Sequence, residues 1–134
     1  MVVGALQAKT NKYTQWISKE GWYRLFRINE SGYGLFFTTK TWSEAKPSAS
    51  LVSFNRLDVK ALLNIDTTYL NVHKVRIVEY ESKYYIDIFH SGNANNGNMF
   101  TVDVVRSYGC TYMELEPVSD ESFTLVKLVS LIGA

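Results

Sequence analysis

The sequence predicts an all-β protein, specifically an antiparallel β-sandwich with a jelly-roll-like arrangement, about eight or nine strands and little helix. Short runs rich in β-branched and aromatic residues are separated by Gly, Asn, Ser and Pro, which is typical of strands joined by turns. Hardly any segment has the apolar periodicity of a helix. Turn residues recur roughly every ten positions, so we expect two antiparallel sheets packed face to face.

The chain has 134 residues, which fits one domain of ordinary size. We expect an N-terminal tether or neck over residues 1–14 and a single β-sandwich domain over residues 15–134. The opening "MVVGALQAKT" has no basic region before its apolar residues and no long apolar run. It therefore lacks the pattern of a signal peptide or of a membrane span.

The first two strands are expected at "GWYRLFRI" (21–28) and "LFFTT" (35–39). Between them, Ser31–Gly32 and Gly34 suit a turn that needs positive φ, so the pattern predicts a hairpin. The polar stretch 41–50 carries a proline and is expected to be a loop that leads to "LVSFNRL".

The segment 58–65, "DVKALLNI", is ambiguous because Asp58 could cap a helix, but its β-rich flanks favour a strand. The runs 72–80 and 84–89 are separated by only a few residues, which predicts an antiparallel hairpin rather than a crossover. Three further strand runs complete the chain: "NMFTVDVV", "TYMELEP" and "SFTLVKLVSLI".

The charge balance argues against two classes of partner. The formal net charge is +1, so no strong field attracts nucleic acid or anionic lipid, and we expect neither nucleic-acid binding nor membrane insertion. The single cysteine, Cys110, cannot form an intrachain disulfide and is expected to be a buried, inert thiol. We expect no metal and no cofactor, because one cysteine, the distant His73 and His90, and the acid-free loop 91–98 form no ligand set.

Catalytic patterns are sparse. A Ser-His-carboxylate triad could use only His73 or His90, and no Gly-x-Ser-x-Gly elbow occurs. Asp87 and Asp103, on strands that could be neighbours, are the one carboxylate pair that could serve glycoside hydrolysis. We favour the alternative that each carboxylate points outward from an apolar strand.

Aromatic residues are abundant, with 3 Trp, 9 Tyr and 7 Phe. Most lie inside strand runs and are expected in the core, but Tyr33, Trp42 and Tyr108 lie in or beside turns. Exposed rings near the amide of Asn95 would suit a saccharide, which combines ring stacking with hydrogen bonds to hydroxyl groups. Packing at a subunit interface is the alternative for these rings.

Three short patterns carry a resemblance to a known family: Gly21–Arg24, then Lys74–Val78, then Tyr85–Ile88 before a Gly- and Asn-rich turn. Together they resemble a module of phage and prophage tail-fibre and minor structural proteins, over most of residues 20–116. The resemblance implies a distal fibre domain, usually trimeric, that contacts other tail or fibre proteins and attaches to a host-surface glycan or protein. It also implies a location on the virion after synthesis in the bacterial cytoplasm without a signal peptide.

The regular motif positions imply that Arg24, Arg76 and Asp87 are framework residues. An arginine and a carboxylate on adjacent strands can form a charge-assisted pair, so at least one of the arginines should pair with Asp87 or another acid. Simple alternation places Arg24 on the same strand face as Trp22, Phe26 and Ile28.

Three functions follow in order of preference. The first is a non-enzymatic receptor-binding domain of a tail fibre, with Trp42, Tyr33, Asn95 and Tyr108 as the candidate glycan-binding residues. The second is a trimerising spacer module, since Leu131 and Ile132 would need cover from a partner chain or a following domain. The third is a polysaccharide-degrading enzyme that uses Asp87 and Asp103.

Overall fold

The computed structural model describes residues 12–16, 19–40, 48–65, 72–92, 99–118 and 123–131, and these residues contain strands and turns but no helix. The all-β, antiparallel prediction is therefore confirmed. The described strands are β1 (Lys12–Trp16), β2 (Gly21–Lys40), β3 (Ser48–Asn55), β4 (Val59–Ile65), β5 (Val72–Tyr80), β6 (Lys83–His90), β7 (Met99–Pro117) and β8 (Thr124–Ser130).

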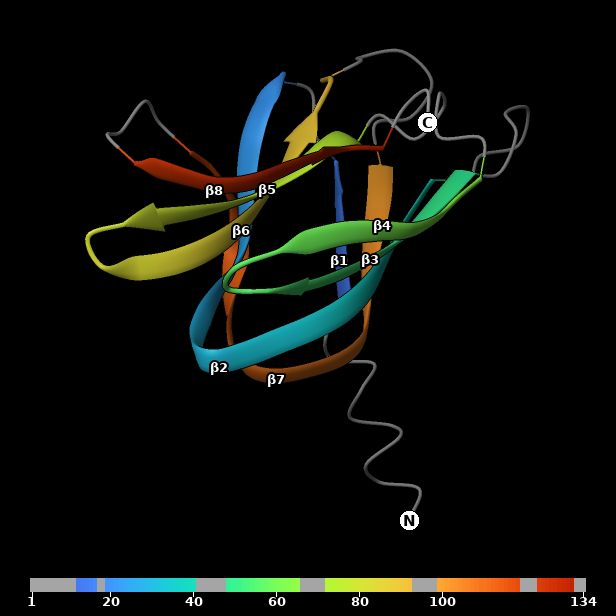
Figure 1. The fold of residues 1–134 in the computed structure, drawn as a ribbon. Coiled ribbons are helices and arrows are strands. Elements are labelled where there is room, and N and C mark those ends of the chain that lie inside the picture. The colour runs from blue at the N-terminus through green and yellow to red at the C-terminus, as the bar shows by residue number, and fades with distance from the viewer. Residues whose placement is uncertain are drawn as a thin grey trace.

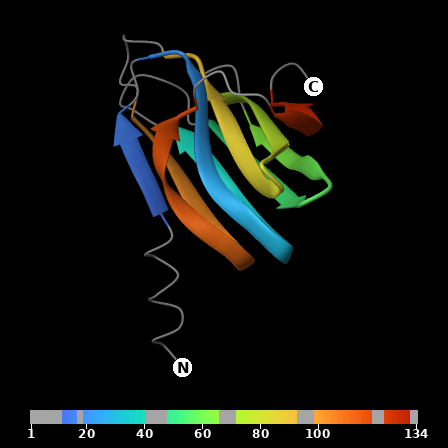
Figure 2. The same cartoon turned by 90° about the vertical axis from the view of Figure 1, so that its left-hand side faces the viewer.

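All of these strands belong to one hydrogen-bonded sheet. Its order is β1-β7-β2-β6-β5-β8, and β3 and β4 branch from β2. The first half of β2 pairs with β6 and the second half with β3, while β7 runs beside both halves. Both long strands bend, so the sheet curls into a nearly closed barrel in which β4 approaches β8 without pairing (Figure 1 and Figure 2). The prediction of a jelly-roll-like sandwich is not confirmed, because the strands form one continuous sheet rather than two separate sheets.

The hairpin predicted between residues 21–28 and 35–39 is wrong, because both runs belong to the single strand β2. The turn-forming residues instead produce a bend, at which the pairing of β2 with β7 shifts between Ile28 and Tyr33. Ser31 has a φ of 64° and Gly109, on β7, has a φ of 65°. A Cβ atom on Gly32 would lie 2.6 Å from the carbonyl oxygen of Gly109, so the two strands touch closely at this corner.

Two other predictions of elements are confirmed. Residues 59–65 form a strand, and β5 and β6 form an antiparallel hairpin. Its turn residues Glu81 and Ser82 have φ values of 52° and 66°, which suit a two-residue hairpin turn. We expected the runs 98–105 and "TYMELEP" as two strands, but residues 99–105 and "TYMELEP" are parts of one strand, β7.

The N-terminal boundary also differs from the expectation. Strand β1 pairs with β7 from Lys12 onward, so residues 12–14 of the predicted tether belong to the sheet. Residues 1–11 and the loops 41–47 and 93–98 lie outside the described residues. Within the described part of the chain, no helix is long and apolar enough to span a membrane.

The core lies inside the curled sheet and contains three aromatic rings in mutual contact. The ring of Phe26 lies 5.7 Å from that of Phe54 and 6.2 Å from that of Phe36. Leu131 is also fully buried in this core, and its backbone N–H donates to the carbonyl oxygen of His73. The expectation that Leu131 needs cover from a partner is therefore wrong, and Ile132 lies outside the described residues.

Candidate functional site

Asp87 lies on β6 between two arginines from the neighbouring strands. Arg24 on β2 donates from Nε and Nη2 to the two carboxylate oxygens of Asp87, at 2.9 and 3.2 Å. Arg76 on β5 donates from Nε at 3.0 Å to the Oδ2 atom. The sequence analysis predicted that at least one of the two arginines would pair with Asp87 or another acid, and both arginines contact Asp87.

Aromatic rings cover this charged cluster. The guanidinium of Arg24 lies 4.1 Å from the centroid of the Tyr85 ring. The guanidinium of Arg76 lies 4.0 Å from the centroid of Trp22 and 4.4 Å from that of Phe123. These contacts remove the cluster from solvent, and Asp87 is 0% exposed. The cluster therefore connects three strands and offers no open surface at Asp87.

The face assigned to Arg24 by simple alternation is wrong. Arg24 lies opposite Asp87, whereas Phe26 lies opposite Ile86, so β2 advances two residues while β6 advances one. This bulge at Leu25 reverses the alternation. Arg24 therefore faces outward with Asp87, while Phe26 and Ile28 face the core.

Tyr33 and Tyr108 form the most exposed aromatic pair on the described surface. They are direct partners in the pairing of β2 with β7, and their rings stack with centroids 5.5 Å apart at an angle of 24°. Tyr33 is 39% exposed and Tyr108 is 61% exposed. Arg106 donates from Nη2 to the hydroxyl oxygen of Tyr33 at 3.4 Å. Two of the predicted glycan-binding residues thus lie together on one surface.

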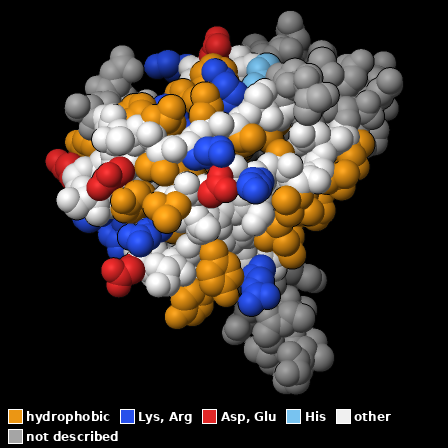
Figure 3. Space-filling view, viewed as in Figure 1, with side chains coloured by type: hydrophobic (Ala, Val, Ile, Leu, Met, Phe, Trp, Pro, Cys, Tyr) orange, Lys and Arg blue, Asp and Glu red, His pale blue; other side chains and the backbone are white. Residues whose placement is uncertain are grey.

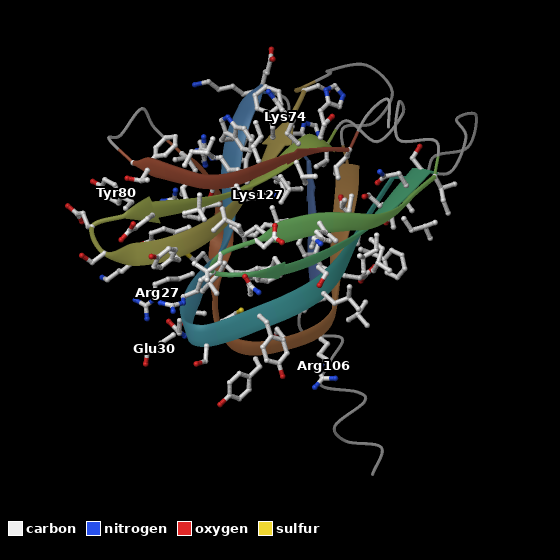
Figure 4. All side chains as sticks on the ribbon, in the orientation of Figure 1. Arg27, Glu30, Lys74, Tyr80, Arg106 and Lys127 are labelled. Carbon is white, nitrogen blue, oxygen red and sulfur yellow. The ribbon has the colours of Figure 1, made fainter. Side chains whose placement is uncertain are left out.

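Arg106, which donates to the Tyr33 hydroxyl, lies at the lower edge of the molecule in the view of Figure 4. Figure 3 shows hydrophobic side chains along this edge with basic side chains on both sides of them. In the same orientation, Figure 4 labels Arg106 on one side of this region and Arg27 and Glu30 on the other. The exposed tyrosine pair therefore has a basic side chain, Arg106, directly beside it.

A hollow of about 300 Å³ lies beside this pair, and we call it the tyrosine hollow. It is lined by apolar and polar side chains: Tyr33, Ser53, Phe54, Asn55, Asp58, Val59, Lys60 and Leu62. Asn55 is the partner of Tyr33 on β3, so one row across three strands runs from Asn55 through Tyr33 to Tyr108. This combination of ring faces with carboxylate, amide and ammonium groups can stack on a sugar and hydrogen-bond its hydroxyl groups.

Cys110 lies next to the tyrosine pair in the fold. Its sulfur is 3.6 Å from the carbonyl oxygens of both Tyr33 and Tyr108. Burial raises the pKa of the Cys110 thiol to about 11, although these two contacts oppose the shift. The thiol is therefore protonated at neutral pH, which suits packing better than nucleophilic attack.

The other two predicted glycan-binding residues, Trp42 and Asn95, lie outside the described residues. Sequence reasoning missed Asn55, Asp58 and Arg106. Their proximity to Tyr33 depends on the order and register of three strands, and no local motif signals it. Only the Asn55–Asp58 turn, with its Asn and Asp residues, gave a local hint of an exposed polar loop.

Asp87 and Asp103 do not form a catalytic pair in this geometry. The expectation that their strands could be neighbours is wrong, because β2 lies between β6 and β7. Asp87 pairs with one half of β2, through Arg24, and Asp103 lies opposite the other half, at Phe37. Neither residue lines the tyrosine hollow. Among the described residues, no group of three or more His, Cys, Asp or Glu side chains could hold a metal ion.

Comparison of the chain with protein-family models, curated proteins and solved structures finds no significant match. The fold and the surface together define an antiparallel β protein with an exposed, stacked tyrosine pair beside a hollow of mixed apolar and polar lining. Its function is therefore argued from this surface.

Proposed function

We propose that this chain is a non-enzymatic domain of a phage or prophage tail fibre, and that it attaches to a glycan on the host surface. The observation that carries this proposal is the stacked, exposed pair of Tyr33 and Tyr108 at the edge of the tyrosine hollow. Adjacent exposed aromatic rings supply flat apolar faces with polar edges, which suit a ligand that is itself partly apolar and partly polar.

The chemistry of the pair suits a saccharide better than a purely apolar ligand. A sugar ring has an apolar face that packs on a flat aromatic ring and hydroxyl groups that need hydrogen-bond partners. The hollow supplies Asn55, Asp58 and Lys60 within the same surface, and the hydrogen bond from Arg106 restrains the Tyr33 hydroxyl. The ring positions are therefore largely preorganised, which lowers the entropic cost of binding.

The tail-fibre part of the proposal rests on the resemblance of the strands that contain Gly21–Arg24, Lys74–Val78 and Tyr85–Ile88. In this proposal the domain is a homotrimer displayed on a virion, in contact with other tail or fibre proteins. The host-surface partner is a glycan rather than a protein, because the hollow is small and its lining combines aromatic and polar groups.

A second candidate function, a trimerising spacer module, is supported by a different observation. In the described ladder, β4 pairs only with β3 and β8 only with β5, so each strand has an unpaired edge. Both strands also expose large apolar side chains: Leu62, Leu63 and Ile65 on β4, and Leu125 and Leu128 on β8. Such edges favour association with another chain.

A cell-binding assay tests the glycan proposal. A fluorescent form of the chain is incubated with a panel of bacterial strains, before and after periodate oxidation of surface sugars or protease treatment of surface proteins. We expect binding to at least one strain, which periodate abolishes and protease leaves intact. Binding lost with protease and kept after periodate would contradict a glycan partner, and absence of binding throughout would favour the spacer function.

Sedimentation equilibrium distinguishes the two trimeric fibre functions, the receptor-binding domain and the spacer, from a monomeric binding module. Both the fibre domain and the spacer predict a trimer whose population increases with concentration. A monomer at every concentration would count against both.

A further inference from the structure

A second hollow, of about 330 Å³, lies where the bend of β2 approaches the β5–β6 hairpin, and we call it the basic hollow. It is lined by Arg27, Ile28, Asn29, Glu30, Arg56, Ser82, Lys83 and Tyr84. These residues come from three segments of the chain, 27–30, 56 and 82–84, so no local motif predicts the hollow. Figure 4 shows Arg27 and Glu30 together at the bend of β2.

The lining carries an excess of positive charge. Three cations, Arg27, Arg56 and Lys83, face a single acid, Glu30. The whole chain has a formal net charge of only +1, so this excess is local to the hollow. A concave surface of one charge sign attracts ligands of the opposite sign.

The two arginines are held in place by their neighbours. Arg27 donates from Nε to the Oδ1 atom of Asn29 at 3.1 Å, and Asn29 donates from Nδ2 to Thr111 at 3.3 Å. The guanidinium of Arg56 lies 5.2 Å from the ring centroid of Tyr84. A planar guanidinium in a fixed position can bind a carboxylate or a phosphate through two parallel hydrogen bonds.

The basic hollow and the tyrosine hollow lie on either side of the turn between β3 and β4. Asn55 lines the tyrosine hollow and the next residue, Arg56, lines the basic hollow. The Oδ1 atom of Asn55 accepts hydrogen bonds from the backbone N–H groups of Leu57 and Asp58 at 2.7 and 2.9 Å, which fixes this turn. One extended ligand could therefore contact both hollows across this turn.

We propose that the basic hollow binds an acidic group of the glycan, a carboxylate or a phosphate, adjacent to a sugar unit that stacks on Tyr33 and Tyr108. This inference rests on the proposed function and adds the chemical class of the glycan. Glu30 balances only one of the three positive charges, so a neutral polysaccharide would leave the other two without a counter-charge, whereas an acidic one would supply it. The small size of the hollow suits one charged sugar unit.

The test is an NMR titration of the isotopically labelled chain at low salt with three probes: methyl galacturonide, glucose 1-phosphate and the uncharged methyl galactoside. We expect backbone shifts at residues 27–30 and 82–84 with at least one charged probe and none there with the galactoside. The charged probe that binds more tightly distinguishes a carboxylate from a phosphate. Equal shifts with all three probes, or none with either charged probe, would overturn the inference.

Substitution supplies the matched control. The loss of one charge-assisted contact in Arg27→Gln or Arg56→Gln should weaken the charged probe roughly ten-fold or more. Lys19→Gln removes the same charge beyond the opposite end of the β2–β6 ladder and should leave the affinity unchanged. If an arginine variant fails to fold, the exposed Lys83→Gln replaces it. An equal loss of affinity for the charged probe in Lys19→Gln and in the hollow variants would show that the effect comes from the net charge of the chain. That result would contradict a specific site in the hollow.

Failure of this inference and failure of the proposed function are distinguishable. If the chain binds cells through a periodate-sensitive glycan and no charged probe shifts the resonances of the basic hollow, the glycan is neutral. In that case only the further inference is wrong. If a charged probe binds in the hollow while periodate leaves cell binding intact, the hollow stands and the proposed function falls.

Discussion

Arg24 and Asp87 are joined by two hydrogen bonds across neighbouring strands, and the Asp87 carboxylate is completely buried. A buried charge is tolerated only when it is paired and hydrogen-bonded, and Asp87 meets this condition through Arg24 and Arg76. The pair fixes the register of β2 against β6 next to the bulge at Leu25. Arg24, Arg76 and Asp87 are thus framework residues, and the candidate ligand-binding surface lies elsewhere.

The first prediction concerns the removal of this carboxylate. Asp87→Ala leaves two guanidinium groups largely buried without their counter-charge, so the free energy of unfolding should fall by about 3 kcal/mol or more. Urea denaturation measures the loss. The exposed Glu20→Ala is the control and should change stability by less than about 0.5 kcal/mol. A change at Asp87 no larger than that of the control would contradict the framework role.

The second prediction concerns a buried hydroxyl group. Thr38 is fully buried, and its Oγ1 atom has no hydrogen-bond partner among the described residues. Thr38→Val replaces the hydroxyl with a methyl group of similar shape, so stability should rise by about 1 kcal/mol. Thr39→Val, on the half-buried next residue, should be close to neutral. A loss of stability in Thr38→Val on thermal denaturation would show that the hydroxyl is satisfied.

The third prediction concerns the bend at which β2 meets β7. In Gly32→Ala the new Cβ atom would lie 2.6 Å from the Gly109 carbonyl oxygen and 2.8 Å from that of Asn29, so backbone must move. We expect a loss of about 2 kcal/mol. Ser31→Gly should instead gain roughly 1 kcal/mol, because Ser31 has a φ of 64°. Equal effects of the two substitutions would indicate that the corner is not tightly packed.

The sequence predicts much of the local structure of this fold. The β5–β6 hairpin was predictable because two β-rich runs are joined by a connection too short for a crossover. The bend at Ser31–Gly32 was not, because the residues that make a tight turn also allow two strands to bend at a close crossing. The bulge at Leu25 was not predictable either, and it places Phe26 and Ile28 on the opposite face from Arg24.

The same limit applies to the site. Tyr33 and Tyr108 were individually recognisable as aromatics beside turns, but their stacking depends on a register between strands that are far apart in sequence. The basic hollow combines residues of β2, the β3–β4 turn and the β5–β6 hairpin, so it required the tertiary structure.

The fourth prediction concerns the ion pair between Lys127 and Asp58, which connects β8 to the turn before β4 across the open side of the sheet. Nζ and Oδ1 are 3.3 Å apart, and Figure 4 shows Lys127 extending from β8 toward β4. The hydrogen bond from Lys127 is the largest influence that lowers the pKa of Asp58 below 3.8. A lowered carboxyl pKa stabilises the fold above the unfolded-state pKa, and this contribution disappears as the pH falls through the folded-state value.

NMR titration of the Asp58 carboxyl measures this effect. In Lys127→Gln its pKa should move upward toward 3.8, and the stability difference between this variant and the parent chain should vanish at low pH. Lys60→Gln is the control, because its charge influences Asp58 less. An Asp58 pKa that is the same in the parent chain and in Lys127→Gln would contradict the pairing.

The central claim, that Tyr33 and Tyr108 bind a host-surface glycan, is tested most directly on an array of bacterial surface polysaccharides. The parent chain, the double variant Tyr33→Ala/Tyr108→Ala and the control Tyr80→Ala are compared, after circular dichroism has established that each is folded. We predict that the parent chain and Tyr80→Ala bind the same polysaccharides and that the double variant binds at least ten-fold more weakly, as expected for the loss of two stacking contacts of about 1 kcal/mol each. Undiminished binding by a folded double variant would contradict the claim.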